Sequence, residues 1–383
     1  MSAELSGYWA DVSQRWDTAE LAASTHRAPK TKVRSSPYRS FMTRILGSEM
    51  PIVITGERGA GKTELYRALT GALPMRREGI SESREDMRAA VDTGRGKIRS
   101  TFLVVPGQDS DPNGKELEDL FSGGRGPRGL IHVVTAGHDH IWGEAELTLV
   151  EAALVRQQDK RQAEIDELEA VRAAIAAAQA KAETARKEAE TAARAVDSAE
   201  SVDVAALIAE AQHAAQAAAE AAGRFTATDA DRLACLTELG TKPLSWHLSE
   251  SQKQDELKRF RLLCRDHLKA SWGRLPSGGQ PIWMIIAVAK CDLWFEDREA
   301  VKKYYVPSTN NADSSFAAEL RDFVAEIGAA RLGRLAILPV ASYPQPRRLT
   351  AALGEQRSTL GKQNTDSLLN HFRNTVGEFC ANR

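Results

Sequence analysis

The residues from Gly56 to Thr63 have the types and the spacing of a loop that binds phosphate. They read Gly-Glu-Arg-Gly-Ala-Gly-Lys-Thr and fit the pattern G-x-x-x-x-G-K-[ST]. The glycines Gly56, Gly59 and Gly61 let backbone N–H groups turn toward phosphate oxygens. Lys62 is expected to reach the β- and γ-phosphates, and the Thr63 hydroxyl is expected to bind Mg²⁺. The pattern predicts a nucleoside triphosphate with Mg²⁺ at this loop.

The elements around the loop indicate the fold that positions it. An apolar run at 52–54 precedes the loop and a helix start at 64–69 follows it, which is the context that such a loop requires. Four more apolar runs end in turn residues and are separated by helical stretches, as buried parallel strands are. The fold class predicted is therefore α/β, with a doubly wound and mostly parallel sheet. The four runs cover 101–105, 130–134, 282–289 and 335–340.

A different kind of segment separates the third run from the fourth. Residues 143–223 are dense in Ala, Glu, Gln, Lys and Arg and contain no proline. Apolar residues alternate there at spacings of three and four, which is typical of a coiled coil, and a break at 197–203 suggests a helical hairpin. A disordered low-complexity tract is the alternative, but alanine favours helix. The expected seam is Leu168, Val171, Ile175, Ala178, Ala182, Ala185, Ala189, Ala192, Val196 and Ala199, then Val204, Ile208, Ala211, Ala215, Ala218 and Ala222.

Three further stretches lie at strand ends, where doubly wound sheets bind their ligands. They are Val105-Pro106-Gly107-Gln108, Ala289-Lys290-Cys291-Asp292 and Val340-Ala341-Ser342. In order and spacing they resemble the DxxG, [NT]KxD and SA motifs of small GTPases. The likeness is nearest to the Ras/Arf group and to the β-subunit of the signal-recognition-particle receptor, and it covers about 51–142 and 275–383.

The resemblance implies a role for each matching residue. Asp292 would accept hydrogen bonds from the N1 and N2 groups of guanine, and Lys290 would lie along the base. The backbone amides of Ala341 and Ser342 would contact the guanine O6 edge. The Gly107 N–H would sense the γ-phosphate, and Gln108 would orient the attacking water. The implied ligands are GTP or GDP with Mg²⁺.

Two positions depart from the motifs of that family. Val104 stands where the Asp of DxxG holds Mg²⁺ through water, which predicts weak Mg²⁺ binding and slow hydrolysis unless Asp109 or Asp111 substitutes. Ala289 replaces the Asn or Thr that ties the base loop to the phosphate loop, which predicts weaker guanine binding. The resemblance therefore implies a switch more readily than a fast enzyme.

Several other residues leave alternatives open. Arg58 either acts on the γ-phosphate in cis or points to solvent, to Glu57 or to a partner. His138 and His140 either bind a metal or are ordinary loop residues. The switch I segment is expected between the phosphate-loop helix and Thr101, with a serine in the Mg²⁺ role. The two candidates for that role are Ser81 and Ser83.

Charge and cysteine content limit the class of protein. The 383 residues carry 51 basic and 52 acidic side chains, a net charge of -1, so no nucleic-acid partner is expected. The four cysteines are widely spaced, which suggests neither zinc nor disulfides and fits the cytoplasm. No apolar run approaches the length of a transmembrane helix. The basic stretch 26–40 is either a solvated linker or a strip that docks on an acidic partner or a membrane surface.

These inferences predict four parts: an N-terminal helical and linker extension at 1–50, a G domain at 51–142 and 275–383, and a helical coiled-coil insertion at 143–274. The expected function is a GTP-binding switch, with slow GTPase activity at most, whose nucleotide state controls protein partners through its switch loops and the insertion. The alternatives are a nucleotide-binding pseudo-GTPase scaffold and a P-loop ATPase or nucleotide kinase. The alanine-rich composition hints at a GC-rich bacterial genome, so the alternative functions would belong to a bacterial multiprotein system.

Overall fold

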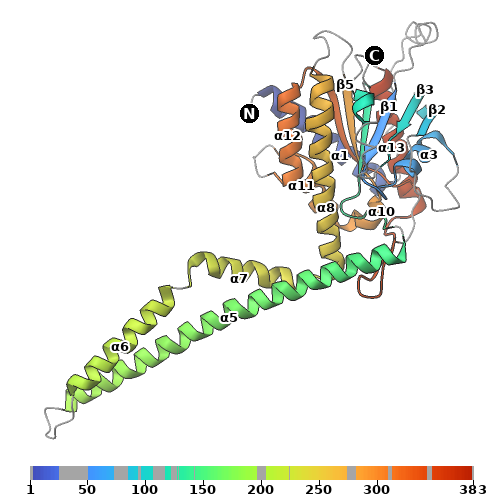
Figure 1. The fold of residues 1–383 in the computed structure, drawn as a ribbon. Coiled ribbons are helices and arrows are strands. Elements are labelled where there is room, and N and C mark those ends of the chain that lie inside the picture. Colours follow the sequence, from blue (N-terminus) through green and yellow to red (C-terminus); the bar gives the residue numbers. More distant parts are fainter. Residues whose placement is uncertain are drawn as a thin grey trace. The chain divides into compact units, whose positions relative to one another are not determined.

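The computed structural model divides into two compact units (Figure 1). One comprises Met1–Leu147 with Leu248–Arg383, and the other comprises Thr148–His247. The first holds the sheet and is called the sheet unit; the second is the helical unit. The structure describes residues 3–25, 51–72, 85–93, 96–106, 117–121, 127, 129–141, 143–195, 204–223, 225–273, 282–308, 313–342 and 347–381.

The sheet unit is built on six strands in the order β2-β3-β1-β4-β5-β6. All neighbouring strands are parallel except β2 and β3, which are antiparallel. The expectation of an α/β protein with a mostly parallel sheet is confirmed, and all five expected strands are present. The strands are β1 (Ile52–Gly56), β2 (Glu85–Thr93), β3 (Gly96–Val104), β4 (Gly129–Val134), β5 (Ile282–Val288) and β6 (Leu332–Pro339).

Strand β2 was not expected from the sequence. It lies in the segment where a switch loop was predicted, so the part of that segment from Glu85 to Thr93 is instead an edge strand paired with β3. Its sequence, EDMRAAVDT, has no continuous apolar run, so the pattern that identified the other strands is absent from β2. Ser81 and Ser83, the expected switch residues, lie outside the described part of the chain.

Helices cover both faces of the sheet. Phe102 of β3 contacts Tyr66 of α3 (Lys62–Thr70), with 5.5 Å between ring centroids. Neighbouring Thr55 of β1 and His132 of β4 point to the opposite face, because successive side chains of a strand alternate. There His132 meets Phe260 of α8 (Leu244–Leu262) at 5.4 Å. Helix α8 and the phosphate-loop helix α3 therefore enclose the sheet from opposite sides.

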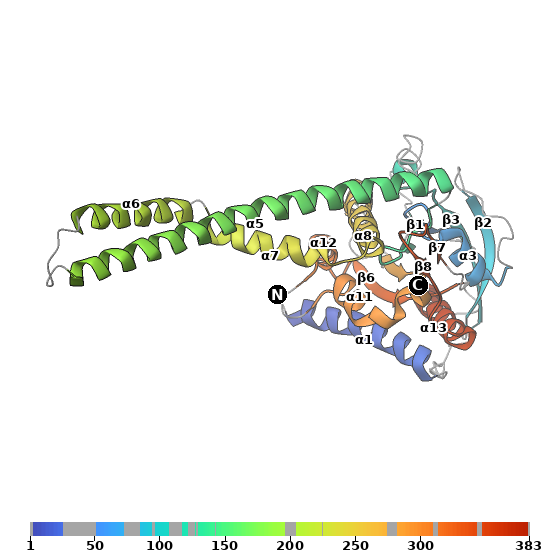
Figure 2. The same ribbon diagram turned by 90° about the horizontal axis from the view of Figure 1, so that it is seen from below.

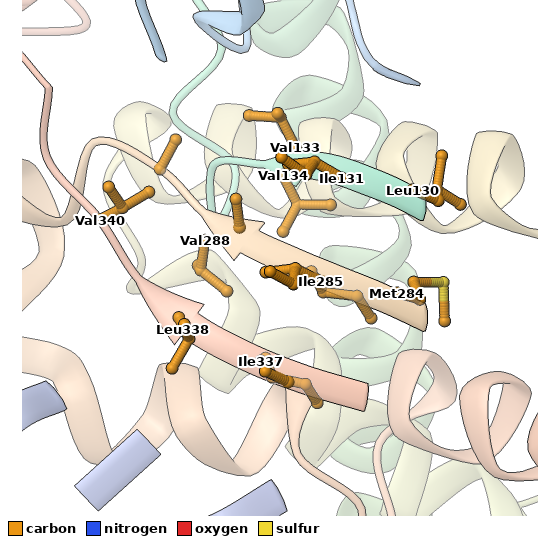
Figure 3. Close-up of a cluster of buried hydrophobic side chains, with 14 of the residues drawn as sticks. Leu130, Ile131, Val133, Val134, Met284, Ile285, Val288, Ile337, Leu338 and Val340 are labelled. Carbon is orange, nitrogen blue, oxygen red and sulfur yellow. The ribbon is translucent and has the colours of Figure 1, made fainter. Parts of the chain in front are cut away.

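The core continues through the three strands β4, β5 and β6. Every residue of β4 and β5 is buried, so both faces of these strands are covered. Figure 3 shows their apolar side chains packed between neighbouring strands, among them Ile131, Ile285 and Ile337. Gly129 is required by this packing, because a Cβ there would lie 2.3 Å from the Trp283 ring. The strand ends that carry the expected site therefore extend from a buried and closely packed core.

The N-terminal helix α1 (Ala3–Thr25) belongs to the sheet unit. Trp9 and Trp16, seven residues apart, lie on the same face of this helix, and both are fully buried. Trp16 stacks on Trp294 at 6.1 Å, and the Tyr8 hydroxyl donates to the Leu332 carbonyl at 3.2 Å. The helix packs on β6 and on α13 (Lys362–Ala381) as part of the fold.

The helical unit contains most of a single long helix, α5 (Glu144–Ala195), with α6 (Val204–Gly223) and α7 (Ala227–Gly240). Its 52 residues make α5 roughly 78 Å long at 1.5 Å per residue. Figure 2 shows α6 and α7 following one another along α5. An ion pair between Arg232 and Glu164 joins α7 to α5, and a capping box at Thr226 begins α7.

The expected seam is only partly correct. On α5 the seam positions from Leu168 to Ala192 are all shielded from solvent at least in part. On α6 the buried residues are Ala214 and Ala218, whereas the expected seam residue Ile208 is 43% exposed. Alanines occur on every face of α6, so spacing alone did not identify the face that packs.

The helical insertion expected at 143–274 is divided between the two units. Residues from Leu248 onward lie in the sheet unit, where α8 continues into η2 (Leu263–Leu268) and α9 (Lys269–Trp272). Among the described residues, none of the helices is long and apolar enough to cross a membrane. The remaining elements are α10 (Cys291–Trp294), η3 (Phe295–Asp297), α11 (Arg298–Tyr305), α12 (Ser315–Ile327), β7 (Arg347–Arg348) and β8 (Glu355–Gln356).

Candidate functional site

The expected phosphate loop lies between β1 and α3. Strand β1 lies between β3 and β4. The next two strands of the chain, β2 and β3, lie on one side of β1, and β4, β5 and β6 lie on the other, so the loop after β1 stands where the strand order reverses. Open α/β sheets bind ligands at this switch point. Gly61 precedes α3 with a φ of 90°, and Gly59 has a φ of 82°, which is a left-handed region that favours glycine. The backbone therefore bends as the motif predicts.

Close packing is a second reason why glycine is needed in this loop, at Gly56 and at Gly59. A Cβ on Gly56 would lie 2.2 Å from the Val133 carbonyl oxygen, and one on Gly59 would lie 2.2 Å from the His140 carbonyl oxygen. The His140 N–H also donates to the Gly59 carbonyl at 3.1 Å. The segment after β4 is thus packed directly against the phosphate loop, which the sequence did not predict.

Lys62 lies inside the loop rather than in solvent. Its Nζ donates to the carbonyl oxygens of Gly56 at 3.1 Å and Glu57 at 2.8 Å. Burial, with the nearby charge of Arg259 adding to it, lowers the pKa of Lys62 to about 8. A buried ammonium is stabilised by an anion, so an arriving phosphate would offset the cost of keeping Lys62 charged.

The two variable residues after Gly56 make ion pairs with flanking helices. Glu57 accepts from Nε of Arg259 on α8 at 2.5 Å, and each side chain is 17% exposed. Arg58 lies 3.5 Å from Glu146 at the start of α5. Of the alternatives for Arg58, pairing with Glu57 is wrong, because Arg259 takes that carboxylate and Glu146 takes the arginine.

Lys290 connects the phosphate loop to the end of β4. It has a φ of 53°, and its Nζ donates to the carbonyl oxygens of Gly59 and His138, both at 2.7 Å. The resemblance implied that Asn or Thr at position 289 would tie these loops together. Ala289 cannot do so with its side chain, and Lys290 supplies the connection instead.

Asp292 follows two residues later and is 3% exposed. Its backbone oxygen accepts from Thr359 N–H at 2.7 Å and from the Thr359 hydroxyl at 3.0 Å. Burial raises the pKa of the Asp292 carboxyl, and a hydrogen bond from Ser358 opposes this rise. Its Oδ2 is buried and has no hydrogen-bond partner among the described residues. A buried carboxylate oxygen without a donor is costly, which suits a position that receives donors from a ligand.

The end of β6 lies beside the end of β5. The Cys291 N–H donates to the Val340 carbonyl at 3.2 Å, and Val340 N–H donates to Val288 at 3.0 Å. Ala341 is buried and Ser342 is partly exposed. The expected base-site residues Lys290, Asp292, Ala341 and Ser342 therefore share one edge of the sheet with the phosphate loop. Gly107 and Gln108 lie outside the described residues, so their predicted roles stay predictions.

Only some of the residues expected to bind a metal stand in a suitable position. Thr63 stands in the first turn of α3, as a Mg²⁺ ligand of such a loop must. Val104, at the position of the family's acid, is 2% exposed in the core. The described part of the chain contains no cluster of three His, Cys, Asp or Glu side chains suited to a metal. His138 Nδ1 lies 2.8 Å from Gln356 Oε1.

A buried carboxylate that the sequence did not reveal holds the segment after β4. Glu256 of α8 accepts at Oε1 from Thr135 N–H at 2.7 Å, from its hydroxyl at 2.8 Å and from Gly137 N–H at 3.3 Å. Its Oε2 accepts from the Tyr305 hydroxyl, which in turn accepts from Ala136 N–H at 3.1 Å. Because α8 lies 119 residues further along the chain than Gly137, no local spacing signals this contact.

We expect Glu256→Ala to lower the free energy of unfolding by about 3 kcal/mol, because two backbone N–H groups and a tyrosine hydroxyl lose their buried acceptor. Urea denaturation of the purified chain measures this. Glu250→Ala is the matched control, since Glu250 lies on the same helix in a partly exposed pair with Lys253 and is expected to matter by less than about 1 kcal/mol. Equal losses in both variants would contradict the assignment.

The buried histidine of β4 predicts a dependence of stability on pH. His132 Nδ1 lies 2.9 Å from the Thr55 hydroxyl, and burial, aided by the charges of Arg259 and Lys62, lowers its pKa to about 3. The unfolded chain binds this proton near pH 6.5 and the folded chain does not, so stability is present above pH 6.5 and is lost as the pH falls toward about 3.

As the pH falls from about 7.5 to about 5, protonation of His132 in the unfolded chain is expected to lower the free energy of unfolding by about 2 kcal/mol. His132→Gln keeps a polar group beside Thr55 but does not titrate, so its stability should fall less over the same interval. Urea denaturation at several pH values measures the difference. Parallel stability profiles for the two proteins would show that His132 does not carry the effect.

The fold and site define an α/β protein with a glycine-rich loop at the switch point of its sheet. No protein-family model matches the chain. No curated protein and no solved structure matches it either. The function is therefore argued from the geometry of the site.

Proposed function

We propose that this protein is a GTP-binding switch whose phosphate site is the loop from Gly56 to Thr63 and whose base site contains Asp292. The single observation that carries the proposal is the buried, unpartnered Oδ2 of Asp292, at the end of the strand next to β4, on the same edge as a phosphate loop. Guanine presents two neighbouring donors, N1–H and the N2 amine, and a carboxylate accepts both. Adenine presents no such pair.

Lys290 supports the same assignment. The ammonium group of Lys290 joins the phosphate loop to the segment after β4, and Lys290 lies two residues before Asp292 in the chain. A change at the phosphates therefore reaches the base site through one side chain. We propose GTP or GDP as the ligand, with Mg²⁺ held by the Thr63 hydroxyl and by the phosphates themselves.

The reaction expected of the site is binding with slow hydrolysis at most. Val104 is buried in the core at the position where the resemblance calls for the Mg²⁺-linked acid. This observation favours a second candidate function, a nucleotide-binding scaffold without turnover. Phosphate release measured over hours from the GTP-loaded protein separates the two, because a scaffold releases none above the rate of free GTP.

The proposed function is tested by competition. We expect a fluorescent GTP analogue to be displaced by GTP and GDP at concentrations at least about 100-fold lower than by ATP, because a buried carboxylate left without donors opposes adenine. Identification of the nucleotide that co-purifies with the protein is an independent measurement. Equal displacement by ATP and GTP would favour a P-loop ATPase and remove the base-reading role of Asp292.

In the switch, nucleotide state would act on protein partners through the loops near the γ-phosphate and through the helical unit. The start of α5 is tied to the phosphate loop by the Arg58–Glu146 pair, and α5 then continues into the helical unit. Hydrogen exchange of α5 and α6 in the GTP-analogue and GDP states tests this idea. Identical exchange in both states would contradict it.

A further inference from the structure

Glu57 places a negative charge inside the loop that is expected to receive a polyphosphate. Its side chain is 17% exposed, so solvent screens this charge only in part. A carboxylate near a phosphate site repels the ligand, and the repulsion grows with the number of phosphate charges. A loop of this sequence therefore needs a cation that neutralises Glu57 before it can bind nucleotide well.

Arg259 supplies that cation from outside the loop. Its Nε lies 2.5 Å from Glu57 Oε1, and its side chain is also 17% exposed. Lys62 donates to the backbone carbonyl of the same residue at 2.8 Å. Two cations thus hold residue 57, one at its main chain and one at its carboxylate.

The helix that carries Arg259 is held firmly. Glu256 lies one turn earlier on α8 and binds the segment after β4 through buried hydrogen bonds. Residues three apart on a helix share a face, so Glu256 anchors the face from which Arg259 reaches the loop. Phe260, the next residue, packs against His132 and Phe316. The guanidinium is therefore positioned before any ligand arrives.

We propose that Arg259 is a positioning residue of the phosphate site, which neutralises Glu57 and holds the loop in the shape that accepts a nucleoside polyphosphate. The proposal rests on the proposed function, since it concerns the same loop. Arg259 acts through Glu57 in this account and does not touch the phosphates. Helix α8 lies in the segment that the resemblance to small GTPases does not cover, so this residue is a feature of the chain itself.

The test is a double-mutant cycle read out as the dissociation constants of GTP and GDP by calorimetry. Arg259→Gln removes the guanidinium that pairs with Glu57 and is expected to weaken binding roughly 10- to 100-fold. Glu57→Gln removes the repelling charge and is expected to tighten binding a few-fold. The double variant Glu57→Gln/Arg259→Gln is expected to recover most of the loss, because no charge remains to be neutralised.

Arg261→Gln is the matched control. Arg261 lies on the same helix and pairs with Glu319 at 2.7 Å, away from the phosphate loop, so its removal breaks an ion pair without affecting the site. Its nucleotide affinity should equal that of the wild-type protein. Thermal unfolding of each unliganded variant shows which of them are folded, and the double variant provides the test if Arg259→Gln alone is too unstable.

Two results would overturn the inference while leaving the proposed function intact. Wild-type affinity in Arg259→Gln would make the ion pair merely structural. A double variant as weak as Arg259→Gln would show that the guanidinium touches the phosphates directly. If the wild-type chain binds neither GTP nor GDP, the proposed function fails, and this inference fails with it.

Discussion

Lys62→Met is expected to lower the affinity for GTP and GDP by roughly 100-fold or more, which is about 2.7 kcal/mol. The Nζ of Lys62 is the buried cation of the phosphate loop, and its hydrogen bonds to Gly56 and Glu57 direct it into the turn. A charge-assisted hydrogen bond to phosphate contributes more binding free energy than a neutral one. The variant loses the expected bonds of Lys62 to both the β- and the γ-phosphate. Methionine is also unbranched and of similar size, and it removes the ammonium group with both its charge and its hydrogen-bond donors.

The same variant should not destabilise the unliganded protein. Burial already lowers the pKa of Lys62 to about 8, which means that the charged form is disfavoured when no ligand is present. The variant is relieved of the buried charge but loses the two hydrogen bonds to Gly56 and Glu57, so we expect the melting temperature of the unliganded variant to stay close to the wild-type value. The increase that saturating GTP produces should disappear, because stabilisation by a ligand follows its affinity.

Lys303→Met is the control for this prediction. Lys303 is exposed on α11 and lies outside the site, so its replacement should change neither the affinity nor the response of the melting temperature to GTP. Calorimetry and thermal unfolding measure both quantities. Undiminished GTP binding by Lys62→Met would show that the loop does not hold the phosphates.

Asp292→Asn is expected to weaken GTP and GDP binding by roughly 100- to 1,000-fold while ATP binding changes little. The carboxylate accepts two donors of guanine in the proposed complex, and asparagine presents a donor of its own to one of them. A site built to hydrogen-bond a ligand discriminates strongly when the pairing is lost. Fluorescent-nucleotide competition against GTP and ATP measures the change in selectivity.

A compensating ligand makes this prediction sharper. Xanthine carries a carbonyl where guanine carries the N2 amine, so it offers an acceptor to the amide of the variant. Asp292→Asn should therefore bind xanthosine triphosphate more tightly than the wild-type protein does. Asp297→Asn, an exposed residue of η3, is the control and should retain guanine selectivity. Loss of GTP and ATP affinity together in Asp292→Asn would indicate a folding defect, and no loss would exclude base reading.

The parts of the fold that could be predicted from the sequence are those specified by patterns within a few neighbouring residues. The apolar runs that became β1, β3, β4, β5 and β6 are buried on both faces, and such strands have continuous apolar sequences. Strand β2 was missed because its sequence, EDMRAAVDT, contains no continuous apolar run. The packing face of α6 was assigned only in part, with Ala218 buried but Ile208 exposed, because alanines on all sides remove the contrast on which a period depends.

The candidate site divides in the same way. The turn conformations of Gly59 and Gly61 and the place of Lys62 at the start of α3 follow from residues adjacent in the chain. Parallel strand ends gather at one edge, so the neighbourhood of Lys290 and Asp292 was also predictable from their positions after β5. Arg259 and Glu256 were not, because nothing in an exposed-looking helical sequence reveals which carboxylate or guanidinium packs against a loop over 100 residues away.

The sequence by itself therefore determined the glycine-rich loop, the buried strands that carry it and the charged residues at their ends. These depend on spacing within a few residues, which the chain encodes directly. Only the tertiary structure decided that Lys290 joins Gly59 to His138 and that α8 neutralises Glu57 through Arg259. The same holds for Asp292, whose carboxylate is left buried with an unpartnered oxygen. Such contacts depend on how distant segments pack, because burial and the partner of a charge are properties of the folded chain and not of its local pattern.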